Sequence, residues 1–277
     1  MNARATEWTA AGTAYQVTGE GEPVVLIHGV GLNKDMWGGQ VVSLAEQYQV
    51  ITYDMLGHGE SAMPHADTGL EGYAGQLLEL VEHLGLARVH VVGFSMGGLV
   101  ARAFAMHYRE RLASLVILNS VFARTPEQRA GVVERTRQAA EFGPNANAEA
   151  ALARWFSREY LAASHAQVDN IRRTLASNDP HGYLTTYSLF ATQDMYRADD
   201  LPGLNVPVLV ATGELDAGST PEMARQLAAR IPGAQVAILA EQRHMMPVES
   251  PRLVNQLLVG FLANVKCLPV QAEGNVA

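Results

Sequence analysis

Six short runs rich in valine, isoleucine and leucine constrain the fold of this chain most strongly. Most of each run is continuously apolar rather than alternating, which is typical of strands buried on both faces of a parallel sheet. The runs are PVVLIH (23–28), YQVITYD (48–54), VHVVGF (89–94), SLVILN (114–119), VPVLVAT (206–212) and QVAIL (235–239). Stretches of helical character separate most of them, at 38–47, 71–84, 96–108, 221–230 and 251–264. The alternation predicts an open α/β sheet, mostly parallel and flanked by helices, with right-handed crossovers.

Two helix starts carry a clear signal. Thr220 precedes Pro221, and Ser250 precedes Pro251. In each pair we expect the hydroxyl side chain to cap the helix and the proline to occupy the first helical position. Near the start of the chain, residues 6–18 predict a short hairpin.

One connection is too long to be a plain loop. More than 80 residues separate Asn119 from Val206, and none of them forms a strand candidate. Connections of that length inside a domain usually carry structure of their own. Here they contain a capping box followed by further helical stretches, at 125–128, 147–157, 165–177 and 181–193.

The chain is long enough for one large core with an insertion, because it has 277 residues, of which 48% are hydrophobic and 17% charged. We expect residues 1–122 and 199–277 to form the α/β core. We expect residues 123–198 to form a helical lid inserted into it.

Charge and cysteine content exclude several classes of protein. A net charge of −8 argues against nucleic-acid binding and against attraction to an acidic membrane surface. Cys267 is the only cysteine, so neither a disulfide framework nor a thiolate metal site is expected. The first 15 residues lack the apolar segment of a secretory signal, and no apolar run reaches the roughly 20 residues that span a bilayer. We expect a cytoplasmic protein whose partner is a small molecule, with a homodimer left open.

The stretch VHVVGFSMGGLV breaks a strand at a serine. Gly93-Phe94-Ser95-Met96-Gly97 fits the pattern G-x-S-x-G, the nucleophile elbow, in which a tight turn between strand and helix admits only small residues beside the serine. The alternative is an ordinary turn, but such a turn requires no hydroxyl at its tip. The position between a strand and a helix favours a nucleophile.

A serine hydroxyl attacks a carbonyl only when a base removes its proton and a carboxylate orients that base. On sheets of this kind the serine, the acid and the histidine follow one another along the chain. Asp216 follows the strand candidate VPVLVAT, and His244 follows the last one, so both are expected at the sheet edge that carries Ser95. Glu214 is the alternative acid, whereas the strand ending at Asn119 offers no carboxylate.

The charge that develops on the attacked carbonyl oxygen needs two backbone N–H donors. Met96, directly after the serine, is expected to provide the first, and Val30, in the loop after the first parallel strand, the second. Gly29 and Gly31 flank Val30 and would let the backbone approach the substrate closely.

The same loop raises an alternative, because Gly29-Val30-Gly31 after a strand, with Asp54 ending the next strand, resembles a dinucleotide fingerprint. Lys34 stands where the third glycine should be, so no nucleotide is expected. The sequence contains no P-loop and no paired metal-ligand spacing, and we expect neither a cofactor nor a metal.

Asp54 and His58 lie in YDMLGHGES, directly after a strand. A carboxylate at that place could be catalytic. An aspartate between a strand and two glycines also shapes a turn, and a histidine there bonds locally. We interpret both residues as structural.

Taken together, the motifs HGVG, YDMLGHGES, GFSMGG, TGELD and RHMMPVESP, in this order and over nearly the whole chain, resemble those of the α/β-hydrolase family. The resemblance implies the α/β-hydrolase fold with an inserted lid. It also places Ser95, Asp216 and His244 at the triad positions, and Val30 and Met96 at the oxyanion positions.

Within that family, the layout resembles 3-oxoadipate enol-lactonases and the hydrolases of aromatic and N-heteroaromatic catabolism. The stretch TGELDAGSTPEMARQLAARIPGA is similar to hydrolases that deformylate or deacylate unsaturated dicarboxylate amides. Meta-cleavage-product C–C hydrolases are relatives that usually carry Asn before the nucleophile, where this chain has Phe94. The serine also argues against dehalogenases and epoxide hydrolases, which use an aspartate.

Several side chains of the expected lid could bind substrate. An arginine would suit a substrate carboxylate, although most arginines on helices face solvent. The candidates are Arg154, Trp155, Arg158 and Tyr187, with Arg172, Arg173 and Tyr183 considered beside them.

The sequence therefore predicts a serine hydrolase acting through an acyl-enzyme on an ester, lactone or amide-like bond of a small carboxylate metabolite. Alternatives within the family are a C–C hydrolase and a broad carboxylesterase. A different class, a hydrolase-fold receptor that senses a small molecule, also keeps an intact triad and remains open.

Overall fold

The computed structural model describes residues 5–265 and contains one eight-stranded sheet. Its order is β1-β2-β4-β3-β5-β6-β7-β8. The strands are β1 (Glu7–Trp8), β2 (Ala14–Thr18), β3 (Glu22–Ile27), β4 (Tyr48–Tyr53), β5 (Val89–Phe94), β6 (Leu112–Leu118), β7 (Val208–Gly213) and β8 (Gln235–Leu239). The first two strands pair antiparallel, as the expected hairpin does, and β2 pairs antiparallel with β4. The other pairs are parallel, and the six apolar runs form them.

The central strands are buried on both faces, which explains their continuous apolar sequence. All six residues of β5 are buried. Val91 packs into the core on one side of the sheet, and its neighbour Val92 packs into the core on the other. The predicted doubly covered parallel sheet is confirmed.

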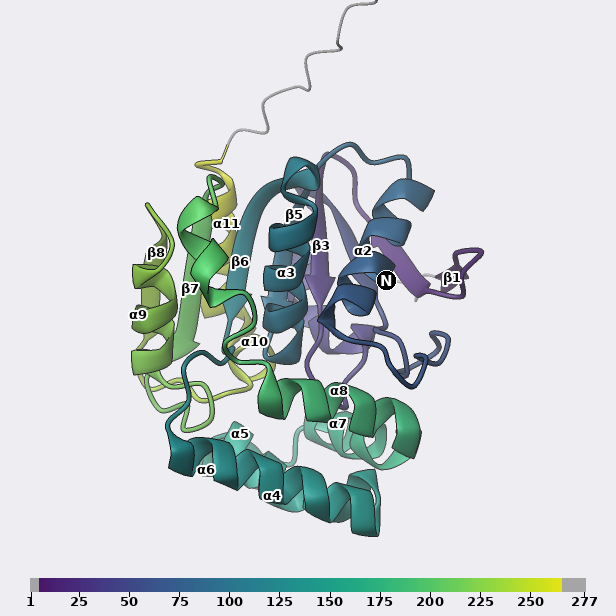
Figure 1. Cartoon of the computed structure of the whole chain (residues 1–277), viewed down its shortest axis with the longest axis vertical. Helices are drawn as coiled ribbons and strands as arrows, with labels where there is room; N and C mark the ends of the chain where they lie inside the picture. Colours follow the sequence, from purple (N-terminus) through teal and green to yellow (C-terminus); the bar gives the residue numbers. More distant parts are fainter. Residues whose placement is uncertain (1–4, 266–277) are drawn as a thin grey trace, which may run out of the picture.

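Helices form a layer on each face of the sheet (Figure 1). One face is covered by α2 (Leu70–His83), α3 (Met96–His107) and α9 (Pro221–Ala229). The opposite face is covered by α1 (Gly38–Leu44) and α11 (Pro251–Leu262). Shorter segments connect these elements: η1 (Lys34–Trp37), η2 (Arg109–Arg111), η3 (Pro144–Asn147), η4 (Ala198–Gly203) and α10 (Met246–Glu249).

Five α-helices between β6 and β7 lie across the end of the sheet toward which the parallel strands point (Figure 1). We call them the inserted helices: α4 (Pro126–Phe142), α5 (Ala148–Trp155), α6 (Arg158–Ala162), α7 (Ala166–Ser177) and α8 (Pro180–Thr192). The capping box is present, since the Thr125 hydroxyl accepts from the N–H of Gln128 and the Gln128 side chain accepts from the N–H of Thr125. The helical stretch expected at 147–157 corresponds to α5, and a further helix that was not expected, α6, begins directly after it, where the Ser157 side chain caps it.

Of the two caps expected before proline, the one at Thr220 is present and the one at Ser250 is wrong. Thr220 caps α9 through its side chain, which accepts from the N–H of Met223. Ser250 precedes α11 but makes no capping hydrogen bond with its side chain. The reason is that α10 ends directly before it, and the N–H of Ser250 donates back to the carbonyl of Met246.

Within residues 5–265, no helix has both the length and the apolar character needed to cross a membrane. Cys267 and the polar tail after Leu268 lie outside the described residues.

Candidate active site

The turn that carries Ser95 is built by glycines with no room for a side chain. A Cβ on Gly93 would lie 2.2 Å from the carbonyl oxygen of Gly97, and a Cβ on Gly97 would lie 2.3 Å from that of Ile27. Ser95 itself has φ 55° and ψ −112°, a conformation that is strained for a residue with a side chain. The helix α3 starts at the next residue, Met96, so the chain turns directly from β5 into α3 at the serine.

Asp216 and His244 come from the loops after β7 and β8 and form a buried pair. The Nδ1 of His244 and the Oδ2 of Asp216 are 2.7 Å apart. The other oxygen, Oδ1, accepts from the backbone N–H groups of Gly218 and Ser219, each at 2.9 Å. Because an ionised carboxylate can only accept, Nδ1 carries the proton, and a neutral imidazole then has its lone pair on Nε2.

The surroundings of Asp216 favour its ionised form. Burial alone would raise its pKa. The charge and hydrogen bond of His244, with further hydrogen bonds from Asn119 and the Ser219 backbone, outweigh burial and lower the pKa of Asp216 below its ordinary value. Glu214, the alternative acid, is exposed and accepts from the N–H of Glu241 instead.

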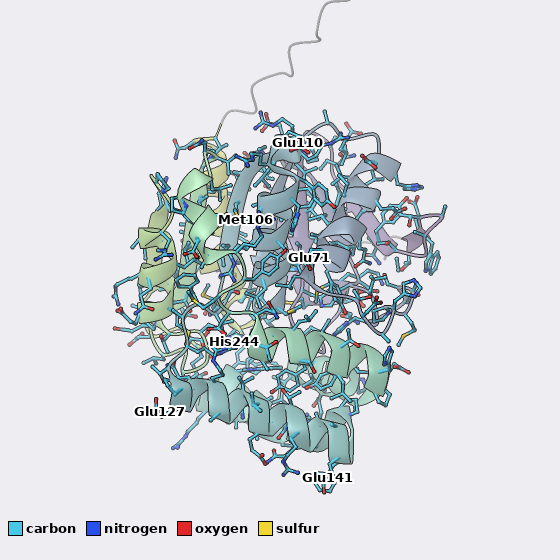
Figure 2. All side chains as sticks on the ribbon, viewed as in Figure 1. Glu71, Met106, Glu110, Glu127, Glu141 and His244 are labelled. Atoms are coloured by element: carbon cyan, nitrogen blue, oxygen red, sulfur yellow. The ribbon has the colours of Figure 1, made fainter. Side chains whose placement is uncertain are left out.

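Two aromatic rings flank the imidazole of His244. The ring centroid of Phe94 is 4.9 Å from it, and that of Trp155, at the end of α5, is 5.8 Å from it. The N–H of Met245 donates to the carbonyl of Trp155 at 3.0 Å, which connects the histidine loop to the inserted helices. Figure 2 shows His244 at the boundary between the sheet and these helices.

The loop after β3 lies against the elbow. A Cβ on Gly29 would lie 3.2 Å from the Cβ of Ser95, so the glycine permits this close approach. Gly31 has φ 70°, and its N–H donates to Nε2 of His58 at 3.0 Å. A Cβ on Gly31 would also lie 2.8 Å from the ring of Tyr183 on α8.

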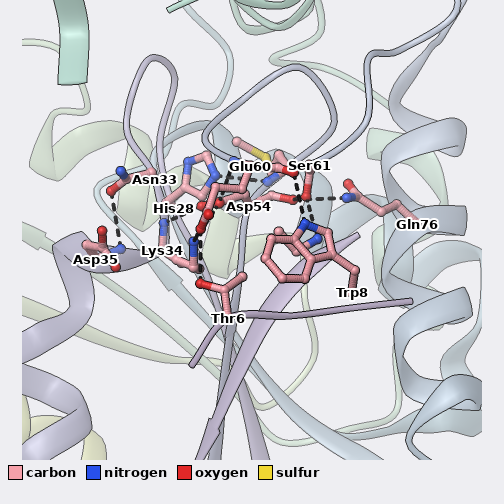
Figure 3. A network of polar contacts seen from close by, with 12 residues as sticks. Thr6, Trp8, His28, Asn33, Lys34, Asp35, Asp54, Glu60, Ser61 and Gln76 are labelled. Carbon is pink, nitrogen blue, oxygen red and sulfur yellow. Dashed lines mark hydrogen bonds and ion pairs between the residues drawn. The ribbon is translucent and has the colours of Figure 1, made fainter. Parts of the chain in front are cut away.

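A buried ion pair fixes the position of this loop (Figure 3). Lys34 occupies the place where a dinucleotide site would need glycine, and its Nζ lies 2.9 Å from Oδ2 of Asp54 and 2.6 Å from Glu60. Asp54 accepts in addition from the backbone N–H groups of Lys34 and Glu60. The contacts of Asp54 agree with the structural interpretation of this residue.

Ser95, Asp216 and His244 all line one cavity of about 310 Å³ between the sheet edge and the inserted helices. The volume lies at the low end of the range for small-molecule sites, about 300 to 1,000 Å³. The Ser95 hydroxyl makes no hydrogen bond to any other group within residues 5–265. Within the same residues, no group of three or more His, Cys, Asp or Glu side chains is arranged to hold a metal ion.

Most of the predicted site residues meet at this cavity, and some do not. Those that line it are Gly29, Val30, Ser95, Arg154, Trp155, Tyr183, Tyr187, Asp216 and His244. Gly31 and Arg158 are not among its lining residues, and Met96 contributes no side chain to it. Arg172 and Arg173 also lie elsewhere: Arg172 pairs with Glu149 and Asp169, and Arg173 hydrogen-bonds Asn170.

The sequence analysis missed two arginines that line the cavity, Arg124 and Arg135. Arg124 is committed to the protein, since it donates to the carbonyl of Phe190 and its guanidinium lies 4.6 Å from the centre of that ring. A signal for Arg135 exists in the sequence. After the capping box, Gln128, Gly131 and Arg135 recur every three or four residues, so they share one face of α4, and this face lines the cavity.

An open, mostly parallel sheet with a serine at its strand-to-helix turn, and with an acid and a histidine on later loops of the same edge, defines an α/β-hydrolase arrangement. The model of the family described as "alpha/beta hydrolase fold" matches residues 22–251, and the chain therefore belongs to this family.

Several similar proteins are named as hydrolases. The (E)-2-((N-methylformamido)methylene)succinate hydrolase of Acinetobacter baylyi is 33% identical over 90% of this chain and 93% of its own length. The structure of a thermophilic esterase from Thermogutta terrifontis with malate bound has 33% identity and a TM-score of 0.82, over 91% of this chain and 93% of its own. The enol-lactonase from Burkholderia xenovorans has 30% identity and a TM-score of 0.84, over 91% and 96%. The chain is thus a hydrolase of the α/β fold.

Proposed function

We propose that this chain is a serine hydrolase that cleaves an ester, lactone or amide-like bond in a small carboxylate substrate through an acyl-enzyme. The observation that carries the proposal is the 2.7 Å contact between His244 and Asp216 at the cavity that also contains Ser95. The strained backbone of Ser95 supports it, since backbone strain of this kind concentrates at functional sites.

In the first half-reaction, His244 Nε2 takes the proton of the Ser95 hydroxyl while the oxygen attacks the substrate carbonyl carbon. Asp216 holds the imidazole with Nδ1 protonated and stabilises the imidazolium. The N–H groups of Val30 and Met96 bind the negative oxygen of the tetrahedral intermediate. Met96 is suited to this role because the first N–H groups of a helix have no acceptor within the helix. The imidazolium then protonates the leaving group as its bond to the carbonyl carbon breaks.

In the second half-reaction, His244 deprotonates a water molecule that attacks the acyl carbon of the ester on Ser95. The second tetrahedral intermediate then collapses: the bond between the Ser95 oxygen and the acyl carbon breaks, the imidazolium of His244 returns the proton to that oxygen, and the carboxylic acid is released. The inserted helices act as a lid that keeps bulk water from the acyl-enzyme. No step requires a cofactor.

The charge of the cavity supports a carboxylate substrate. Arg135 and Arg154 line it, and neither forms an ion pair within residues 5–265. Burial first, and then the nearby charge of Arg135, lower the pKa of Arg154. The positive charges of Arg135 and Arg154 repel each other, and a bound anion would reduce that repulsion. A guanidinium can also bind a carboxylate with two hydrogen bonds.

The related proteins support the same substrate class. The name of the Acinetobacter relative specifies a succinate derivative, and the Thermogutta esterase was solved with malate bound. Both observations support a small carboxylate, and with the resemblance in sequence we propose a substrate from aromatic or N-heteroaromatic catabolism.

The test is a comparison of the Ser95→Ala variant with the wild type on p-nitrophenyl esters, enol-lactones and N-acyl enamine dicarboxylates. We expect turnover to fall by several orders of magnitude, since losing a triad member normally has this effect. A fluorophosphonate probe should label the wild type on Ser95 and leave the variant unlabelled. Ser188→Ala, an exposed serine on α8, is the matched control. A Ser95→Ala enzyme that retains more than about a hundredth of the activity would refute the role of Ser95.

A further inference from the structure

We propose that Asn119 and Ser120, the two residues that follow β6, are positioning residues. Asn119 orients the acid of the proposed triad, and Ser120 orients the peptide that carries one oxyanion donor. The inference rests on the proposed function and extends it to two side chains that line no part of the cavity.

Asn119 holds the oxygen of Asp216 that faces the histidine. Its Nδ2 donates to Oδ2 of Asp216 at 2.9 Å, the same oxygen that lies 2.7 Å from Nδ1 of His244. An ionised carboxylate cannot donate, so the amide must present its nitrogen here. Asn119 therefore restricts the direction in which Asp216 Oδ2 can accept from the imidazole.

The same amide nitrogen also contacts the loops that carry both residues. It lies 3.3 Å from Oγ1 of Thr212, at the end of β7, and 3.5 Å from the carbonyl oxygen of Arg243, the residue before His244. One side chain thus connects the end of β6 to the acid loop and the histidine loop.

The conformation and environment of Asn119 agree with this role. Its backbone has φ 48°, in the left-handed region that asparagine tolerates better than most residues, and its N–H donates to Ala211 of β7 at 2.8 Å. The residue is fully buried, and its Oδ1 has no hydrogen-bond partner within residues 5–265. Burying a polar oxygen without a hydrogen-bond partner costs free energy of folding. The hydrogen bond from the Asn119 nitrogen to the charged Asp216 offsets that cost.

Ser120 acts on the nucleophile turn. Its hydroxyl donates to the carbonyl oxygen of Ser95 at 2.7 Å. That carbonyl and the N–H of Met96 belong to one planar peptide unit, so fixing the first fixes the direction of the second. Gly98 makes the approach possible, because a Cβ there would lie only 2.5 Å from the Cβ of Ser120.

The variants Asn119→Gly and Asn119→Asp test the first role, and both tolerate the left-handed backbone. The partners of the Asp216 carboxyl are the imidazole of His244, the amide of Asn119 and two backbone N–H groups, and among these only the imidazole can become charged. Removing a donor leaves more negative charge on Asp216, which stabilises the imidazolium. The acidic limb of the pH profile of kcat/KM should therefore move to higher pH by about half a unit in Asn119→Gly. Asn119→Asp should stay closer to the wild type, because two buried carboxyls at this distance share one proton and the protonated one can donate to Asp216 as the amide does.

The variant Ser120→Ala tests the second role. A misdirected Met96 N–H should weaken binding of the transition state but not of the substrate, so kcat should fall about tenfold with little change in KM. A boronic-acid inhibitor, which resembles the tetrahedral intermediate, should lose affinity by a similar factor. Ser120→Thr keeps the hydroxyl and should restore kcat.

The outcomes separate this inference from the proposed function. If Ser95→Ala is inactive while Asn119→Gly is folded and keeps the wild-type pH profile, the role of Asn119 is overturned. If Ser120→Ala keeps its kcat within about twofold, or loses substrate and inhibitor affinity equally, the role of Ser120 is overturned. If Ser95→Ala remains active, the proposed function itself fails. Thermal unfolding of each variant separates loss of fold from loss of positioning.

Discussion

Gly31 and His58 connect the loop after β3 to the loop after β4: the N–H of Gly31 donates to Nε2 of His58 at 3.0 Å. This bond requires an unprotonated Nε2, and Nδ1 lies 3.2 Å from the carbonyl oxygen of Leu56, to which it donates. Burial, with the neighbouring His28 as a smaller cause, lowers the pKa of His58 from 6.5 to about 3. The contact therefore exists only while His58 is neutral.

The first prediction is that His58 makes the fold sensitive to acid. The unfolded chain takes up a proton on this residue below about pH 6.5, whereas the folded chain does so only near pH 3. The contribution to stability is thus complete above pH 6.5 and is lost progressively as the pH falls toward 3. Each unit of pKa difference corresponds to about 1.4 kcal/mol, so the loss amounts to several kcal/mol.

Urea unfolding of the wild type and of His58→Gln across this pH range measures the effect. Glutamine keeps an acceptor for the Gly31 N–H but has no proton to take up, so the free energy of unfolding should fall less steeply with acid. His65→Gln, which replaces an exposed histidine, should retain the wild-type slope. Equal slopes for His58→Gln and the wild type would contradict the prediction.

The second prediction concerns the buried pair of Lys34 and Asp54. The side chain of Lys34 is 3% exposed and that of Asp54 is fully buried. Lys34→Met leaves the carboxylate without its cation, and we expect the free energy of unfolding to fall by about 3 kcal/mol or more. Arg111→Met is the control, because its pair with Glu82 is exposed and should contribute less than about 1 kcal/mol. Similar losses in the two variants, measured by urea unfolding, would show that burial does not govern the contribution of these pairs.

The third prediction distinguishes the two candidate acids. In Asp216→Asn, the amide can present a donor to His244 Nδ1 and favour the wrong tautomer, so kcat should fall by roughly 10⁴ with the fold retained. Glu214→Gln should leave kcat close to the wild-type value, since Glu214 is exposed and contacts the backbone of Glu241. The reverse result, measured on any substrate the wild type hydrolyses, would make Glu214 the acid.

Sequence patterns predicted those features that depend on neighbours along the chain. The apolar runs became the parallel strands, and the glycines around Ser95 allow the predicted turn. The same patterns failed where a contact depends on distant residues. Asn119 attracted notice only as a strand end without a carboxylate, because its partner Asp216 lies 97 residues further on. Ser250 is a failure of a different kind: it carries the signature of a cap, yet the short helix directly before it determines its conformation.

The fourth prediction concerns the arginines of the cavity. The Nε of Arg135 donates to the hydroxyl of Tyr187 at 3.3 Å, and Arg154 donates to the carbonyl of Ala150, so neither guanidinium is neutralised by these contacts. A hydrogen bond to a charged group contributes about 1.5 to 3 kcal/mol. If a substrate carboxylate binds between the two, Arg135→Gln or Arg154→Gln should lower kcat/KM for carboxylate substrates by about 10- to 100-fold.

A neutral ester of similar size provides the comparison within each variant. Its kcat/KM should change little, because it presents no charge to either guanidinium. Arg173→Gln is the matched control, since Arg173 lies outside the cavity and bonds Asn170 on its own helix. Equal losses for the neutral and the charged substrate would mean that the arginines shape the cavity through packing alone. A selective loss confined to the carboxylate substrate is the expected result, and it would assign the anionic end of the substrate to α4 and α5.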